Sequence, residues 1–162
     1  MGRSLKLGFI LCLAWLCMTG CYGNPVYYFD RVVVRAGLDF ERFTQVMADL
    51  KVKGYSMVEK RRYVFTATGR LIISRTPEEP PQHVDLGKDH QVVAAGMIRY
   101  QMSEDPFKLT TIEIDNDSPS FCTPAEQLEA VAKFISTIGG GRWHVGLQLS
   151  EHGAENCARQ VR

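Results

Sequence analysis

The residue types in this chain that are most able to do chemistry are its cysteines and histidines. A catalytic cysteine needs a nearby imidazole to lower the pKa of its thiol, and the beginning of a helix also favours the thiolate. Cys122 stands just before one predicted helix and His144 just after it, so these two side chains are a candidate catalytic pair. Neither residue lies in a catalytic signature, and the chain has no Gly-x-Ser-x-Gly or His-Glu-x-x-His pattern.

Two groups of side chains invite comparison with metal sites. The first group lies in one polar segment and consists of His83, Asp85, Asp89 and His90. These residues do not have the close, regular spacing of known metal-ligand motifs. In the second group, Asp115, Asp117 and Glu126 occupy places one, three and twelve of a calcium loop. Pro119 and Ser120, however, stand where such a loop needs Asp or Asn and then Gly. The sequence therefore predicts no metal or cofactor.

Two further motifs each have a structural explanation beside a functional one. The run 139–141 is Gly-Gly-Gly, but it follows a predicted helix, whereas a phosphate loop opens one. The basic run 60–62 is Lys-Arg-Arg and has two interpretations: it grips an anionic surface such as lipid headgroups, or it is the solvated edge of a strand.

The first 21 residues have the organisation of an export signal. Arg3 and Lys6 give a positive start, and residues 7–18 are twelve apolar or small residues without a charge. A stretch this short cannot cross a hydrocarbon core, which needs about 20 residues, but it has the length of a secretory h-region. Met18-Thr19-Gly20-Cys21 follows it.

This arrangement resembles a bacterial lipoprotein signal peptide, whose lipobox ends in a cysteine that is acylated and becomes the first residue. Thr19, Gly20 and Cys21 match the box, while Met18 replaces the typical Leu. The resemblance implies a lipid anchor on Cys21, and Tyr22, which is not Asp, implies the outer membrane, facing the periplasm or the exterior. The alternative is an ordinary signal peptide cut near Gly20 or Gly23, which leaves a free soluble protein.

Lipidation of Cys21 would also make the cysteine count even. Five cysteines occur, and the leader (residues 1–20) contains Cys12 and Cys17. If Cys21 carries lipid, only Cys122 and Cys157 remain to pair in an oxidising compartment. A helix of about 16 residues and a returning strand have similar lengths, so the end of the strand should lie beside Cys122. We therefore predict a disulfide between Cys122 and Cys157.

Charge and length restrict the kinds of partner. The leader contains two of the 19 basic residues and no acidic one, so the mature chain has 17 Lys and Arg against 18 Asp and Glu. Near neutrality gives no reason to expect nucleic acid as a partner. Residues 21–28 are a short tether with Gly, Asn and Pro, which keeps the domain of residues 29–162 within about 30 Å of the bilayer.

The periodicity of apolar residues predicts the elements of that domain. Two amphipathic helices are expected: the first has its apolar stripe over residues 40–50 with Asp39 as N-cap and Gly54 as a stop, and the second begins at Thr123 as N-cap and ends at the glycine run. Strands are predicted at 29–36, 55–66, 70–75, 91–102, 107–114 and 143–149. Hairpin turns are expected at 68–69 and 103–106, with an exposed loop at 76–90 and a polar tail at 151–162.

The order β-α-β-β-β-β-α-β predicts an α+β fold in which two helices pack on one mainly antiparallel sheet. A ferredoxin-like arrangement with an inserted hairpin is one topology that fits. In the last strand, Trp143, Val145, Leu147 and Leu149 should face the core, and the alternate residues should face water.

The predicted location in the envelope and the small size of the domain together favour a non-catalytic protein-binding or accessory module that binds another envelope protein. An inhibitor or immunity-type protein is one subclass that fits. Two alternatives stay open at this point. One is a small envelope hydrolase that uses Cys122 or the loop histidines His83 and His90, and the other is a structural subunit of an envelope assembly.

Overall fold

The computed structural model describes residues 24–50, 58–76, 80–103 and 108–160. The leader, Cys21, the expected helix stop at Gly54 and most of the expected turn at 103–106 lie outside these residues. The strands are β1 (Val26–Tyr27), β2 (Arg31–Arg35), β3 (Val58–Thr66), β4 (Arg70–Ser74), β5 (Val92–Ser103), β6 (Lys108–Asp115) and β7 (His144–Gln148). The helices are α2 (Phe40–Leu50), α3 (His83–Leu86), α4 (Ala125–Gly139) and α5 (Glu151–Gln160).

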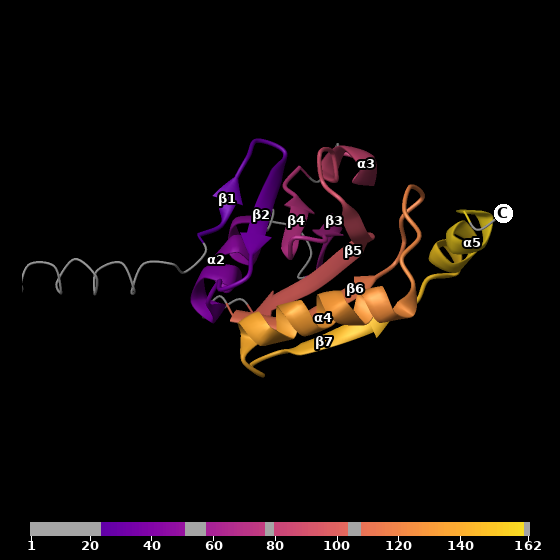
Figure 1. The fold of residues 1–162 in the computed structure, drawn as a ribbon. Coiled ribbons are helices and arrows are strands. Elements are labelled where there is room, and N and C mark those ends of the chain that lie inside the picture. The colour runs from indigo at the N-terminus through magenta and orange to yellow at the C-terminus, as the bar shows by residue number, and fades with distance from the viewer. Residues whose placement is uncertain (1–23, 51–57, 77–79, 104–107, 161–162) are drawn as a thin grey trace, which may run out of the picture.

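All seven strands belong to one open sheet in the order β1-β2-β4-β3-β5-β6-β7 (Figure 1). Neighbouring strands are antiparallel except β6 and β7, which are parallel and are connected in the chain by α4. The predicted α+β class with a mainly antiparallel sheet is confirmed. Because β4 lies between β2 and β3, the first half contains a split β-α-β unit, whereas α4 leads to β7 at the far edge of the sheet.

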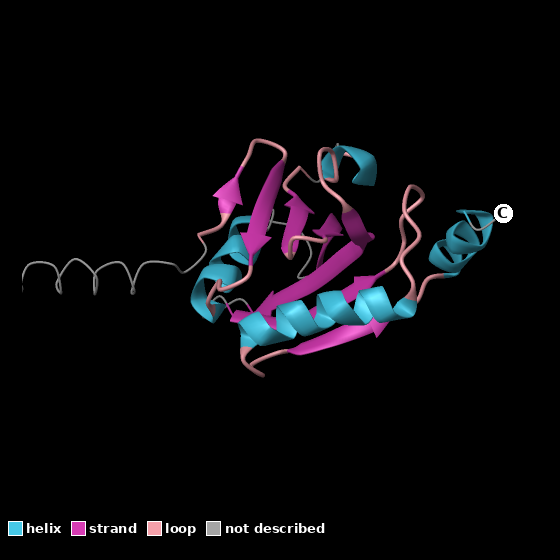
Figure 2. Ribbon diagram, viewed as in Figure 1, coloured by secondary structure: helices cyan, strands magenta, loops and turns pink. Residues whose placement is uncertain are grey.

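The two long helices and one face of the sheet form the larger apolar core. The stripes Phe43, Val46, Met47 and Leu50 of α2 and Leu128, Val131, Ile135 and Ile138 of α4 are buried in it, as their spacing predicted. Figure 2 shows α4 lying along the sheet beside β7. On the other face, alternate strand residues form a smaller cluster with Leu86 of α3. Leu86 thus packs a short helix onto the second face of the sheet.

Local signals at the helix ends explain where the helices start and stop. The Asp39 carboxylate accepts a hydrogen bond from the Arg42 amide at 2.8 Å, which confirms it as the cap of α2. Gly140 ends α4 in the left-handed conformation, with φ of 55°, and its amide bonds the Ser136 carbonyl at 3.0 Å. The glycine run is therefore a helix stop, as expected.

Three segments predicted as irregular contain regular structure. Val26–Tyr27, assigned to the tether, forms β1 and pairs with β2. The loop predicted at 76–90 contains α3, in which His83 and Leu86 are buried. The polar tail contains α5. The shared cause is that tertiary contacts, rather than a long apolar stripe, hold each of these short elements in place.

No helix among the described residues is long and apolar enough to cross a membrane.

Candidate functional site

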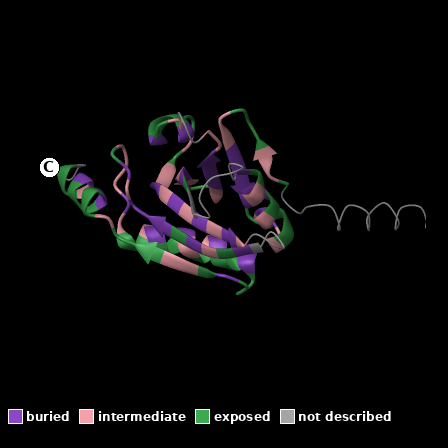
Figure 3. Cartoon of the chain, turned by 180° about the vertical axis from the view of Figure 1, so that it is seen from behind, coloured by how far each residue is buried: buried purple, intermediate pink, exposed green. Residues whose placement is uncertain are grey.

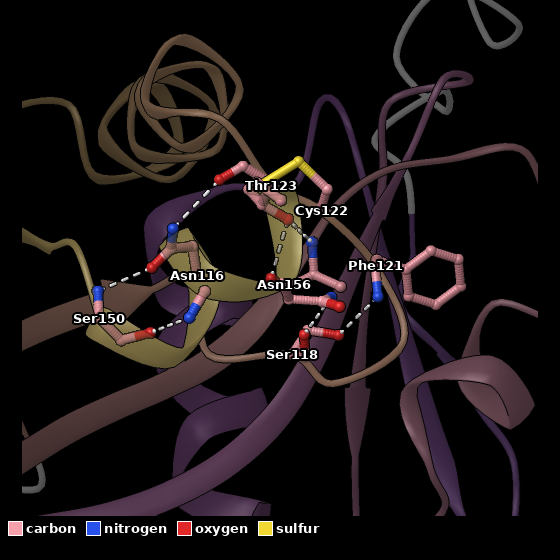
Figure 4. Close-up of a disulfide and its surroundings, with 10 residues drawn as sticks. Asn116, Ser118, Phe121, Cys122, Thr123, Ser150 and Asn156 are labelled. Atoms are coloured by element: carbon pink, nitrogen blue, oxygen red, sulfur yellow. Dashed lines mark hydrogen bonds between the residues drawn. A yellow bond between two sulfur atoms is a disulfide. The ribbon is translucent and has the colours of Figure 1, made fainter. Parts of the chain in front are cut away.

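The predicted disulfide is present and joins the segment before α4 to α5 (Figure 4). The Cα atoms of Cys122 and Cys157 lie 4.5 Å apart, within the usual range for a bridge. The prediction that the end of the last strand returns to the beginning of α4 is also confirmed, because the two cysteines meet there. A bridged sulfur is not a thiolate, so the hydrolase that would use Cys122 as its nucleophile is wrong for this oxidised protein.

Buried amide side chains surround the disulfide and tie three segments together (Figure 4). Asn116 accepts a hydrogen bond from the Ser150 amide at 2.8 Å and donates one to the Thr123 carbonyl at 3.2 Å. Asn156 of α5 donates to the Ser118 carbonyl at 2.9 Å. Two of these bonds satisfy carbonyl groups of the irregular segment 116–124, and the third satisfies the amide of Ser150. A buried backbone group without a hydrogen-bond partner would destabilise the fold.

The helix α5 docks through small and polar residues. Ser150 accepts a hydrogen bond from the Gly153 amide at 2.9 Å and so caps the helix. At Gly153, a Cβ atom would lie 2.4 Å from the Asn116 carbonyl oxygen, so only glycine permits this approach. Gly153, Asn156 and Cys157 thus form the inward stripe of α5 at helical spacing. Sequence reasoning missed it because these residues are not apolar, although Ser150 was a recognisable capping signal.

Thr123 does not cap α4 as predicted. Pro124 occupies the cap position without a side-chain hydrogen bond. The Thr123 hydroxyl instead accepts a hydrogen bond from the Ala95 amide at 2.8 Å and donates one to the Ala95 carbonyl at 3.0 Å. Thr123 therefore fixes the beginning of α4 to strand β5, beside the disulfide.

The loop histidine His83 is a buried structural residue. Its Nε2 lies 3.0 Å from the Gly96 carbonyl oxygen, which can only accept, so Nε2 carries the hydrogen. Its Nδ1 is buried without a hydrogen-bond partner among the described residues. Burial is the main cause that lowers the pKa of His83, and Arg62 adds to this, while the bond to Gly96 and the charges of Asp117 and Asp115 oppose it.

The acidic residues of the calcium-like pattern differ in their surroundings. Asp115 is buried, pairs with Arg99 at 3.0 Å and accepts hydrogen bonds from the Met97 and Asp117 amides at 2.8 and 2.9 Å. Glu126 lies exposed on α4. Among the residues that the structure describes, no three His, Cys, Asp or Glu side chains converge as a metal site would require.

The other sequence candidates do not converge either. His144 begins β7, at the opposite end of α4 from Cys122, and the 15 residues of that helix span about 22 Å.

The side chains of the basic run 60–62 do not form one exposed patch. Arg61 is buried and donates to the Leu50 carbonyl, and Arg62 donates to the Pro80 carbonyl at 2.6 Å. Because β3 lies inside the sheet, the solvated strand edge expected for this run is wrong, whereas Lys60 is exposed and the grip on an anionic surface stays a prediction.

A shallow groove of about 430 Å³ lies between the beginning of α2 and the end of α4. Phe40, Glu41, Gly139 and Arg142 are among its lining residues. The Arg142 guanidinium pairs with Glu41 at 3.2 Å and lies 4.4 Å from the centre of the Phe40 ring. Asp39 also lines the groove, and its carboxylate lies 3.7 Å from the Arg42 guanidinium, so each charged side chain of the groove is held in an ion pair.

The strand β7 is an open edge with exposed leucines. The predicted inward alternation holds for Trp143, which is buried, but Leu147 and Leu149 are 46% and 61% exposed. Figure 3 shows β7 from behind as a largely exposed strand. Among the described residues, β7 pairs only with β6, so its outer backbone groups face no strand. The prediction that both leucines face the core is wrong, because β7 is an edge strand with a neighbouring strand on one side only among the described residues.

The opposite edge carries a second exposed apolar group. Tyr27, Tyr28 and Phe29 at the turn between β1 and β2 are 41%, 53% and 91% exposed. Arg75 donates to the Tyr28 carbonyl at 2.6 Å and its guanidinium lies 5.5 Å from the centre of the Tyr27 ring. The arginine fixes the turn while Phe29 points away from the described protein.

Comparison of the chain with protein-family models, with curated proteins and with solved structures found no match.

Proposed function

We propose that this chain is a membrane-anchored, non-catalytic module that binds another protein of the bacterial envelope through the open edge of β7. The proposal combines the lipobox-like leader, which would place an acylated Cys21 at the outer membrane, with the exposed strand at the far side of the sheet. An inhibitor or immunity-type protein is the subclass that we favour, because its action requires an exposed surface and no catalytic centre.

The observation that carries the proposal is the character of the β7 edge. Soluble proteins protect edge strands with charged residues, proline, bulges or very short strands. The five residues of β7 are His-Val-Gly-Leu-Gln, which contain neither proline nor Asp, Glu, Lys or Arg. Such an edge pairs readily with an extended segment of a partner, whose main-chain groups complete the sheet.

The exposed leucines give this edge an apolar anchor. Leu147 lies on β7 and Leu149 directly follows it, so a strand added to the edge would cover both. Removing a leucine side chain from water on binding contributes about 1.5–3 kcal/mol when its burial is complete. We therefore assign the partner contact to β7 and the two leucines together.

The test is affinity capture of the anchored protein from cell envelopes after mild crosslinking, with partners identified by mass spectrometry. The variant L147K/L149K places two charges on the edge without disturbing buried side chains. We expect it to lower recovery of a specific partner by at least about tenfold. The variant V84K is the matched control, because Val84 is 50% exposed on α3 at the other face.

Three results would contradict the proposal. One is equal partner recovery by L147K/L149K and the unsubstituted protein, and another is equal loss in V84K. Recovery of only further copies of this chain would favour a structural subunit of an assembly instead.

A further inference from the structure

We propose that the aromatic turn, defined as Tyr27, Tyr28 and Phe29, lies in the interface of the bilayer to which Cys21 anchors the chain. This inference rests on the proposed anchoring and deepens it, because it fixes which edge of the sheet faces the membrane. Figure 1 shows this turn between β1 and β2, on the side of the sheet where the chain enters the domain.

The first step is the exposure of the turn. Three consecutive aromatic side chains leave water-accessible surface that contributes nothing to the described core, and Phe29 is 91% exposed. Removing a large apolar side chain from water is favourable. Aromatic side chains, above all those of Tyr and Trp, gather at membrane–water interfaces, where an apolar ring and a polar end are both accommodated.

The second step is the length of chain that separates the turn from the anchor. Only four residues lie between Cys21 and Val26, the first residue of β1. At about 3.6 Å per extended residue, β1 begins no farther than about 18 Å from the anchored cysteine. The edge strand β1 must therefore stay near the lipid headgroups, and the aromatic turn follows it directly.

The third step is the local charge, which suits contact with a zwitterionic surface. Arg31 pairs with Asp30 at 3.1 Å, and the Tyr27 hydroxyl donates to Asp49 at 3.1 Å. Arg75 is placed beside the ring of Tyr27. The two arginines balance the two aspartates, so the aromatic rings rather than net charge would hold the turn at the membrane.

This orientation places the β7 edge, which we propose as the partner contact, on the side of the domain that is farthest from the membrane. The sheet has six strand spacings of about 4.8 Å, so β7 lies about 29 Å across the sheet from β1. With β1 at the bilayer, Leu147 and Leu149 lie at the edge of the sheet that is farthest from the membrane, where an envelope protein can reach them.

The test attaches the chain beginning at Cys21 to vesicles and measures tryptophan quenching by brominated lipid. After leader removal, Cys21 is the one thiol outside the disulfide, so it couples selectively to a maleimide lipid in phosphatidylcholine vesicles. F29W and L149W each add one exposed reporter. The buried Trp143 gives the background, which the unsubstituted chain measures.

We expect brominated phosphatidylcholine to quench the F29W reporter at least about threefold more than the L149W reporter. The emission of F29W should also shift to shorter wavelength on attachment, whereas that of L149W should not. Added salt should leave both results unchanged, because the contact does not depend on net charge.

Two outcomes would overturn the inference: an unquenched F29W reporter, or an L149W reporter quenched as strongly as F29W. Coupling to the maleimide lipid replaces the acylation by the cell, so these outcomes do not depend on whether Cys21 is acylated in vivo. Failure of the orientation is thereby distinguished from failure of the anchor, and partner capture by β7 is measured separately.

Discussion

At the scale of single residues, the chain uses polar side chains to satisfy buried backbone groups. Asn116, Thr123 and Asn156 each bond main-chain groups of the segment around the disulfide. Gly96 shows how tightly this region is built, because a Cβ atom there would lie 1.9 Å from the Asp115 carbonyl oxygen. The residues that looked reactive in the sequence are thus mainly structural.

The buried imidazole of His83 predicts a pH dependence of stability. Burial lowers its pKa, so the folded protein keeps His83 neutral at pH values where the unfolded chain, with an ordinary histidine pKa of about 6.5, takes up a proton. The stability from this group is therefore complete above about pH 6.5 and is lost as the pH falls toward the lowered folded-state pKa. The slope cannot exceed about 1.4 kcal/mol per pH unit for one proton.

Denaturant unfolding between pH 5 and 7 measures this effect. The variant H83Q keeps a donor for the Gly96 carbonyl and cannot titrate, so its free energy of unfolding should change less with pH than that of the unsubstituted protein. H144Q, which alters an exposed histidine, should retain the original slope. If the free energy of unfolding changes equally with pH in H83Q and in the unsubstituted protein, His83 does not cause the pH dependence of stability.

At the scale of elements, the helix α5 depends on its crosslink. The bridge closes a loop with a sequence separation of 35 residues. Closing a loop of this size stabilises the folded state by about 4 kcal/mol on the chain-entropy model. Few apolar side chains of α5 are buried, so we expect the double variant C122A/C157A to lower the free energy of unfolding by roughly 2–4 kcal/mol.

Hydrogen exchange tells which part of the molecule responds to loss of the bridge. Amides of α5 should lose protection in C122A/C157A, while those of β3 and β5 should keep most of theirs, because these strands are the centre of the sheet. If α5 amides stay as protected as in the oxidised protein, the hydrogen bonds of Ser150 and Asn156 alone hold the helix.

The elements that the sequence predicted are those with long periodic patterns. The stripes of α2 and α4 and the consecutive apolar residues of β2 and β4 each bury several side chains, so local pattern and tertiary structure agree. The helices α3 and α5 were missed because α3 is four residues long and α5 buries Gly153, Asn156 and Cys157. The polar network around Asn116 depends on contacts between segments that a single sequence does not pair.

At the scale of the whole molecule, the two edges of the sheet have different characters. The β1 edge carries the aromatic turn close to the predicted anchor, and the β7 edge carries Leu147 and Leu149 on the opposite side. The disulfide was predictable because the cysteine count and the return of the strand agreed. The open edge of β7 was not, since Val145, Leu147 and Leu149 follow the alternation expected of a strand with one buried face.

Acylation of Cys21 underlies both the proposed anchoring and the proposed orientation, and the intact mass of the protein tests it most directly. The protein should be extracted from the membrane fraction of bacteria that express the full chain. We predict one species with the mass of residues 21–162, less two hydrogens for the disulfide, plus a diacylglyceryl group and an N-linked acyl chain. A chain that begins at Cys21, or at another residue, and carries no acyl group would contradict the account.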